Sequence, residues 1–254
     1  MGIGPGDERN MTMAARQALQ DAEHVFGYST YIELVRPLLE NKSITATGMR
    51  KEVDRVREAV HTARQGTTSA LICSGDPGIY ALAGLVFEIC SESEIFFGEG
   101  PGQIRVEVIP GVPALGAGAA LLGAPLTTDF AAISLSDLLT PWEKIQKRIR
   151  AAAEADFVLI LYNPKSKKRN WQLEAAKSII LEHRLPDTPV GLVTSAMRQE
   201  QSVTLATLAG LDSNLVGMQT TVFVGSSETF AYQGRMVTPR GYKDKYHLGP
   251  ENGS

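Results

Sequence analysis

The chain has 254 residues, of which 43% are hydrophobic and 21% are charged, and its formal net charge is −3. This hydrophobic fraction is enough for one large core or two smaller ones, so disorder is not expected. The slightly acidic balance, without a long basic run, argues against a general nucleic-acid binder. No apolar stretch is long enough to predict a membrane span.

Cysteine and histidine usage predicts neither a disulfide framework nor a metal site. The two cysteines, Cys73 and Cys90, are expected to be ordinary buried thiols, which fits a reducing compartment. The four histidines are scattered and make no metal-ligand spacing with two cysteines. No secretory signal is visible, so we expect a cytoplasmic protein.

In the first half of the chain, apolar periodicity and turn residues predict alternating helices and strands. Thr12 is suited to cap the first helix. In chain order we expect a helix over 13–23, a strand over 25–28, a helix over 30–40, an extended segment over 44–47, a helix over 50–64, a strand over 69–73, a helix over 79–91 and a strand over 104–109.

The second half repeats this alternation. We expect a helix over 115–122, a strand over 131–135, a helix over 141–153, a strand over 157–161, a helix over 167–183 and strands over 190–194, 202–208 and 219–224. The pattern predicts an α/β protein with mostly parallel sheets. We place a domain boundary after residue 114, which gives an N-terminal α/β domain of residues 1–114 and a C-terminal α/β domain of residues 115–254.

A glycine-rich loop stands at the start of the chain, where Gly2, Gly4 and Gly6 lead to Asp7. It could hold a phosphate, but it lacks the third glycine of the dinucleotide fingerprint and the Lys-Ser/Thr of a P-loop. A tight turn is the plain alternative. Loops of this type normally follow a strand, so we expect either a truncated chain or a missing first strand.

Four further loops follow predicted strands, at residues 74–80, 110–114, 161–165 and 194–198. Each could be an ordinary turn. Ligands in α/β folds bind at the carboxyl ends of strands, so four such loops together suggest a lined cleft. A basic cluster at residues 165–169 is either solvated surface or an anion site.

No Ser-His-acid or Cys-His arrangement and no pair of carboxylates stands out. Hydrolytic and nucleophilic functions therefore rank low, and no general acid or base is identified. A reaction that depends on positioning two ligands needs few reactive side chains.

The order of the motifs at residues 2–7, 11–12, 74–77, 110–114 and 125–127 resembles the tetrapyrrole (precorrin) methylases over nearly the whole chain. Residues 75–84, 161–169 and 224–229 are most similar to the branch that methylates C17 of precorrin-3B or cobalt-precorrin-3, with ring contraction, in cobalamin biosynthesis. The resemblance implies two α/β domains with the active-site cleft between them, S-adenosylmethionine as cofactor, a small-molecule tetrapyrrole substrate and a homodimer.

The resemblance also implies site residues. The cofactor pocket is expected to contain Ser74, Gly75, Asp76, Ile79, Pro113, Ala114, Tyr162, Asn163 and Ala206. The tetrapyrrole is expected to meet Gly4, Pro5, Gly6, Asp7, Thr127 and Thr128. Its carboxylates are expected to meet Lys165, Lys167, Lys168, Arg169 and Arg198, since cations pair with carboxylates.

Two other functions stay open. The chain could be another methylase of the same fold that acts on a different precorrin carbon, on uroporphyrinogen or on a macromolecule; the net charge argues against RNA. It could also be a non-catalytic ligand-binding protein, if a missing first strand leaves the cleft incomplete.

Overall fold

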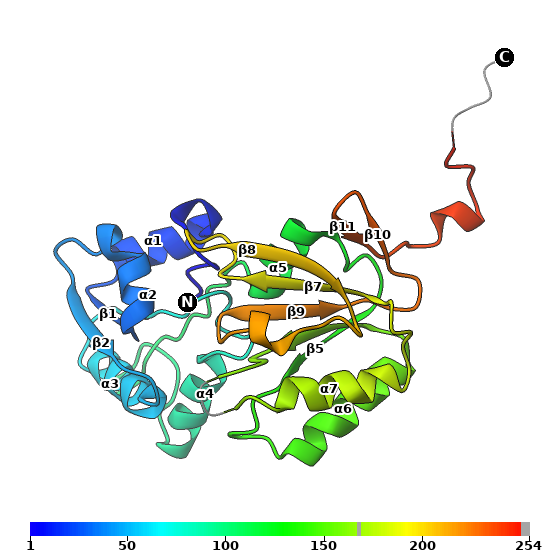
Figure 1. Ribbon diagram of the computed structural model, residues 1–254. Helices are drawn as coiled ribbons and strands as arrows, with labels where there is room; N and C mark the ends of the chain where they lie inside the picture. Colours follow the sequence, from blue (N-terminus) through cyan, green and yellow to red (C-terminus); the bar gives the residue numbers. More distant parts are fainter. Residues whose placement is uncertain (167–168, 250–254) are drawn as a thin grey trace. The chain divides into compact units, whose positions relative to one another are not determined.

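The computed structural model describes residues 1–166 and 169–249 (Figure 1). They form two compact units, one of Met1–Ala117 with Ala196–Gln199 and one of Gly118–Ser195 with the chain from Glu200 onward. The division into domains of residues 1–114 and 115–254 stays a prediction. No helix among the described residues is long and apolar enough to cross a membrane.

The first unit is built on a parallel three-stranded sheet of order β2-β1-β3. Thr12 caps its first helix as predicted, because its hydroxyl accepts from Ala15 N at 3.1 Å. The elements are α1 Met13–Asp21, β1 His24–Tyr28, α2 Ser29–Leu34, β2 Ser43–Thr47, α3 Glu52–Arg64, β3 Ser69–Leu71 and α4 Ala83–Glu92.

Alternating side chains of this sheet fill two cores. Val25 and Ala70, which face each other across β1 and β3, pack with residues of α1 and α2. Leu71, one residue further along β3, packs with residues of α3 and α4 instead. This switch follows from the two-residue period of a strand, which sends neighbouring side chains to opposite faces.

The segment 1–4 lies beside β3 and its extension. Ile3 N donates to Cys73 O at 2.9 Å, and Cys73 N donates to Met1 O at 3.0 Å. Gly2 pairs with Cys73 in parallel, and Gly4 pairs with Gly75. Residues 1–4 therefore pair, through isolated bridges, with the residues that follow β3.

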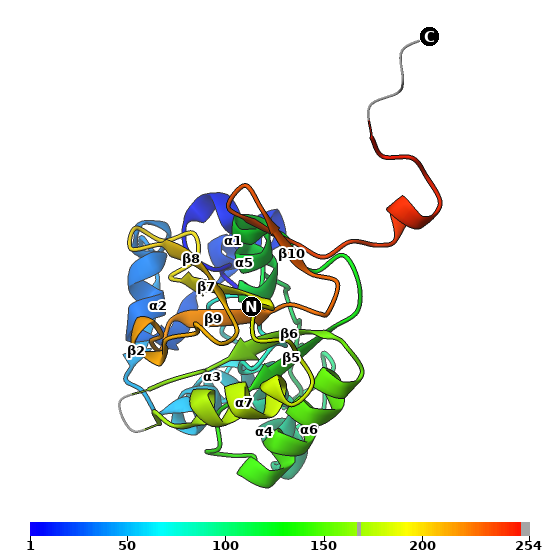
Figure 2. The same cartoon turned by 45° about the vertical axis from the view of Figure 1, so that its right-hand side comes forward.

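The second unit contains a five-stranded sheet of order β5-β6-β9-β7-β8 and a small sheet of order β10-β11-β4. Helices α6 and α7 lie side by side along the larger sheet (Figures 1 and 2). The elements are α5 Ala114–Leu122, which begins in the first unit, and β4 Gly123–Ala124, β5 Phe130–Ser134, α6 Trp142–Glu154, β6 Val158–Tyr162, α7 Gln172–Leu181, β7 Pro189–Thr194, β8 Ser202–Thr207, β9 Thr220–Val224, β10 Phe230–Tyr232 and β11 Arg235–Val237.

The two faces of the larger sheet are covered differently. Leu159, Val190 and Val222 belong to the core that includes α6 and α7. On the other face, α5 packs closely at two glycines: an added Cβ at Gly191 of β7 would meet the Leu122 side chain, and one at Gly118 of α5 would meet the Phe223 ring. Each glycine therefore permits close helix-to-sheet packing.

The prediction of mostly parallel sheets is wrong for the second unit. Only β5 and β6 are parallel in the larger sheet, while β6-β9, β7-β9 and β7-β8 are antiparallel. The reason is topological: β7 and β8 are joined by a short loop, which brings the chain straight back, and β9 then inserts between β6 and β7.

Three predicted elements differ in extent. The helix expected over 30–40 ends at Leu34 and gives way to a 3-10 turn, Arg36–Leu38, at Pro37. The helix expected from residue 79 begins at Ala83, because Tyr80 has φ 51°, which is incompatible with a right-handed helix. The strand expected over 104–109 reduces to one bridge between Phe97 and Ile104.

Two further differences lie in the second unit. The helix expected over 167–183 begins at Gln172, and Ser166 N donates to Arg169 O at 2.8 Å before it. Strands β10 and β11, which were not predicted, form a hairpin at Gln233 and Gly234, whose φ values of 45° and 74° suit a two-residue turn.

Candidate functional site

Three of the predicted loops meet within the first unit through glycine backbones. A Cβ at Gly111 would overlap the carbonyl oxygen of Gly75, and a Cβ at Gly2 would overlap the same oxygen. Gly2 N donates to Ile109 O at 2.9 Å, and Gly75 N donates to Gly4 O at 2.7 Å. The loops at 2–7, 74–80 and 110–114 are thus joined backbone to backbone, which only glycine allows at these points.

Asp76 fastens two of these loops to each other. Its Oδ1 accepts from Gly78 N at 2.8 Å, and its Oδ2 accepts from Gly111 N at 3.1 Å. The first bond closes the turn after β3, and the second reaches 35 residues along the chain. Thr12 adds a third tie, since its hydroxyl donates to Pro110 O at 3.2 Å. Both carboxylate oxygens of Asp76 therefore shape the loops themselves.

The segment Ala196–Gln199 packs with the first unit and carries the predicted site residue Arg198. Arg198 Nε donates to Pro5 O at 2.7 Å, and its Nη2 donates to Ser74 Oγ at 2.8 Å. Asp7 N donates to Met197 O at 3.1 Å. Gly6 lies so close to Met197 that a Cβ added at Gly6 would overlap the Met197 carbonyl. Arg198 thus joins the glycine loop to the turn after β3.

The carboxylate of Asp7 is engaged locally. It accepts from Arg9 Nη2 at 2.7 Å and from Asn10 Nδ2 at 2.8 Å. The hydrogen bond from Arg9 is the main reason that the pKa of Asp7 is lowered. Asp7 is therefore a charged residue at the start of the short 3-10 turn Glu8–Asn10, and its carboxylate is bound by side chains of that turn.

The remaining predicted cofactor residues of the first unit border the same loops. Ser74, Ile79, Pro113 and Ala114 are half-buried, and Gly75 is buried. Gly75 has φ 70°, and the nearest atoms to an added Cβ there are Ala114 N and Pro113 Cα, both at 3.8 Å. The first unit therefore contains six of the nine predicted cofactor residues, together with Gly4, Pro5, Gly6, Asp7 and Arg198.

The other predicted residues belong to the second unit. Tyr162 ends β6 and Asn163 follows it with φ 51°; Asn163 Nδ2 donates to Ser134 Oγ, at the end of the neighbouring strand, at 3.0 Å. Ala206 lies on β8, opposite Val190. Tyr162 and Asn163 thus lie at the carboxyl end of a strand, and Ala206 lies within the strand predicted over 202–208.

The predicted cationic residues of the second unit are bound to backbone carbonyls. Lys165 Nζ donates to Ser213 O at 2.7 Å, and Arg169 Nη1 donates to Asn163 O at 3.1 Å and to Leu135 O at 3.4 Å. Both side chains thereby support the loop after β6. Lys167 and Lys168 lie outside the described residues.

Thr127 and Thr128 are exposed in the loop after β4. The hydroxyl of Thr127 donates to Thr238 O, the first residue after β11. Sequence reasoning singled out Thr127 but not Thr238, and no sequence motif marks the pair, because 111 residues separate them.

Three of the predicted loops contain non-glycine residues in the left-handed region. Tyr80, Asn163, Ser195 and Met197 all have φ between 50° and 59°, although none is glycine. Such conformations cost about 1–3 kcal/mol each and persist where the surroundings impose them, often at ligand sites. Each of the loops at 74–80, 161–165 and 194–198 contains at least one.

Two titratable groups near these loops, Cys73 and Tyr31, have raised pKa values. Burial raises the pKa of the Cys73 thiol and, in the same way, the pKa of Tyr31. Both therefore stay protonated near neutral pH and do not act as bases there. Among the described residues, no cluster of three His, Cys, Asp or Glu side chains could hold a metal ion.

The model of the tetrapyrrole (corrin/porphyrin) methylase family matches residues 1–212. The chain is 50% identical over 248 residues to the cobalt-factor III methyltransferase of Priestia megaterium, covering 98% of this chain and 45% of that protein, so it spans less than half of that relative's length. It is 47% identical over 242 residues to the probable cobalt-factor III C(17)-methyltransferase of Salmonella typhimurium, covering 95% of this chain and 98% of that protein.

A solved structure titled as the methyltransferase CobJ has the same fold. It matches with a TM-score of 0.87 and 34% identity, and the match covers 94% of this chain and 97% of that one. Two α/β units of the tetrapyrrole methyltransferase type, as expected from the motifs, are therefore confirmed.

Proposed function

Because this chain belongs to the tetrapyrrole (corrin/porphyrin) methylases, we propose that it transfers a methyl group from S-adenosylmethionine to C17 of cobalt-factor III, with ring contraction, in cobalamin biosynthesis. The observation that carries this choice is the 47% identity, over nearly the full length of both chains, to a relative named as a cobalt-factor III C(17)-methyltransferase. The metal-free precorrin-3B is the closest alternative substrate.

The loops of the first unit fit S-adenosylmethionine. Residues 74–79 and 111–114 are mostly small or present backbone groups, which suits close approach by a nucleoside. We assign the cofactor to Ser74, Gly75, Asp76, Ile79, Pro113 and Ala114, with Tyr162, Asn163 and Ala206 from the second unit. When bound, this cofactor supplies a methyl group that its sulfonium already activates.

The protein's contribution is then geometric. The glycine contacts, Asp76 and Arg198 fix three loops before any ligand arrives, so little conformational entropy is lost on binding. Holding two reactants in line accounts for much of such a reaction without a reactive side chain. This agrees with the absence of a Ser-His-acid or Cys-His arrangement in the sequence.

The tetrapyrrole is assigned to the glycine loop at 4–7 and to Thr127 and Thr128. Arg198, Lys165 and Arg169 each donate to protein groups, so we assign them first to holding the loops. Arg169 and Lys165 still border the loop after β6, where the substrate's carboxylates would find positive charge nearby.

The test is a methyl-transfer assay with [methyl-13C]S-adenosylmethionine. The protein is incubated with cobalt-factor III and, separately, with precorrin-3B, and the product is examined by NMR. We expect one labelled methyl group at C17 from cobalt-factor III. No transfer to either substrate, while an authentic C17-methyltransferase succeeds under the same conditions, contradicts the proposal. A label at another carbon identifies a different methylase of the same fold.

Two coarser proposals accompany this one. We propose a homodimer, for which the exposed Phe230 and Tyr232 of β10, at 46% and 60% exposure, offer apolar surface. We also propose a cytoplasmic location, which agrees with two free, buried cysteines. Sedimentation equilibrium at micromolar concentration tests the dimer, and a monomer at all concentrations contradicts it.

A further inference from the structure

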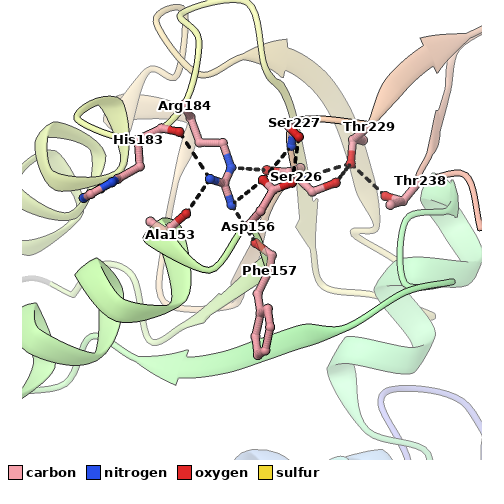
Figure 3. A network of polar contacts seen from close by, with 10 residues as sticks. Ala153, Asp156, Phe157, His183, Arg184, Ser226, Ser227, Thr229 and Thr238 are labelled. Atoms are coloured by element: carbon pink, nitrogen blue, oxygen red, sulfur yellow. Dashed lines mark hydrogen bonds and ion pairs between the residues drawn. The ribbon is translucent and has the colours of Figure 1, made fainter.

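The turn that follows β9, residues 225–229, resembles the C17-methylating branch of the family but has no role in the proposed function so far. It is held on one side by Asp156. Ser227 N donates to Asp156 Oδ1 at 2.8 Å, and Ser227 Oγ donates to Asp156 Oδ2 at 2.6 Å (Figure 3). Asp156, which follows the end of α6, has a left-handed backbone conformation with φ 61°.

Arg184 anchors the same turn from the interior. Its side chain is only 2% exposed and lies 3.1 Å from Asp156 Oδ1. Its guanidinium also donates to four carbonyl oxygens, those of Ala153 at 2.5 Å, Phe157 at 3.1 Å, His183 at 3.3 Å and Gly225 at 3.3 Å. These five partners use all five N–H groups of the guanidinium. Arg184 therefore has a structural role and is not available to bind an anion.

On its other side the turn ends in a buried cluster of hydroxyl groups. Ser226, Thr229 and Thr238 are 5%, 7% and 2% exposed. Thr229 Oγ1 accepts from Ser226 N at 2.9 Å and lies 3.2 Å from Ser226 Oγ and 2.8 Å from Thr238 Oγ1. A hydroxyl has one donor and two acceptor positions, so the Thr229 hydroxyl is fully used.

Thr238 connects the hydroxyl cluster to the loop after β4. Strands β11 and β4 run parallel, with Val237 opposite Ala124, so the residues that follow them leave side by side. Thr238 N donates to Ala124 O at 3.0 Å, and Thr238 O accepts from the hydroxyl of Thr127. The buried cluster therefore ends at an exposed threonine of the loop assigned to the tetrapyrrole.

We propose that Thr229 and Thr238 are positioning residues for tetrapyrrole binding, which act by fixing the carbonyl that holds Thr127. This inference rests on the proposed function, because Thr127 is assigned to the substrate there. This positioning depends on the turn at 225–229, which Asp156 and Arg184 hold in place. The cluster stabilises a loop conformation and does not itself touch the reacting atoms.

The first test compares Thr238→Val with Thr238→Ser in the whole protein. Valine keeps the shape and removes the hydroxyl, whereas serine keeps it. For Thr238→Val we expect the KM for the tetrapyrrole to rise roughly tenfold, equivalent to about 1.4 kcal/mol. The KM for S-adenosylmethionine should change by less than about twofold, and Thr238→Ser should remain near the wild type.

A double-mutant cycle tests the route through Thr127. If Thr238 acts through Thr127, the variant Thr127→Val with Thr238→Val should bind the tetrapyrrole no more weakly than Thr127→Val alone. Ile149→Val serves as the control for lost stability, since Ile149 is fully buried in α6 and lies outside the cluster. Additive losses, or equal rises in both KM values as a general destabilisation would give, overturn the proposal.

A second measurement needs no substrate and separates this proposal from the proposed function. Amide hydrogen exchange of residues 126–128 should be faster in Thr238→Val than in the wild type, Thr238→Ser and Ile149→Val. Unchanged exchange overturns the proposal even if the protein methylates cobalt-factor III. If the wild type transfers no methyl group, the proposed function fails on that result, while faster exchange still shows that Thr238 holds the loop.

Discussion

Replacing Asp76 tests how the loops of the first unit are held. Its carboxylate accepts one hydrogen bond from Gly78 N at 2.8 Å and one from Gly111 N at 3.1 Å. Hydrogen bonds to a charged group contribute about 1.5–3 kcal/mol when buried, and these two are partly exposed, so we take about 1 kcal/mol for each. Asp76→Ala should therefore weaken S-adenosylhomocysteine binding by about 2 kcal/mol, close to thirtyfold.

Asp76→Asn separates the two ways in which this residue could act. An amide oxygen can replace one carboxylate oxygen, so a loop-holding role predicts a loss of about half that of Asp76→Ala, with little dependence on salt. A direct charge interaction with the cofactor predicts an asparagine variant as weak as the alanine variant and a loss that shrinks at high ionic strength.

Isothermal titration calorimetry at low and high salt makes this measurement. Asp54→Ala is a matched control, because Asp54 is an exposed carboxylate of α3 that pairs with Lys51. Wild-type affinity in Asp76→Ala would show that Asp76 does not hold the loops for binding and would remove it from the site. A loss shared by Asp54→Ala would show that the effect is not specific to the loops.

Three further outcomes follow from the contacts. Gly111→Ala should lower the free energy of unfolding by about 1–3 kcal/mol in urea, because its Cβ would overlap the Gly75 carbonyl, whereas Gly48→Ala, with open space around it, should not. Arg184→Met should lower the free energy of unfolding by about 3–5 kcal/mol in the same measurement, since it leaves several buried carbonyls unpaired. A change below about 1 kcal/mol would contradict the structural role of Arg184. Cys73 should resist iodoacetamide in the folded protein at pH 8, because burial raises its pKa and keeps the thiol neutral, and should react on unfolding; rapid labelling of the native protein would contradict this.

The sequence predicts features that depend on neighbouring residues. Thr12 caps α1, and the loops after β3 and β6 fall where strand-ending turn residues place them. Glycine at residues 2, 75 and 111 marks places of close approach, although the sequence does not say what approaches. The structure supplies the answer, since these three glycines approach one another.

Contacts between distant residues could not be predicted. Gly111 N reaches Asp76, Arg198 reaches Pro5 and Ser74, and Thr127 reaches Thr238 across separations that no local pattern encodes. The antiparallel insertion of β9 was missed for the same reason, because a strand's partner is chosen by tertiary packing. The β10-β11 hairpin had a local signal, the glycine at 234 between two short alternating runs.

These contacts also change the meaning of the cationic residues. Positive charge near a polycarboxylate substrate suggests direct pairing, yet Arg198 donates to the Pro5 carbonyl and the Ser74 hydroxyl. A clamp of this kind explains why an arginine, with its forked donors, stands in that loop. The loops are thereby set by the protein before the ligands arrive.

A crystal structure with S-adenosylhomocysteine shows whether the joined loops of the first unit hold S-adenosylmethionine for methyl transfer. We predict that the ligand contacts residues 74–79 and 111–114, with Asp76 still bonded to Gly78 N and Gly111 N. A ligand bound away from these loops, or no binding at millimolar concentration, would contradict the assignment of the cofactor to these loops.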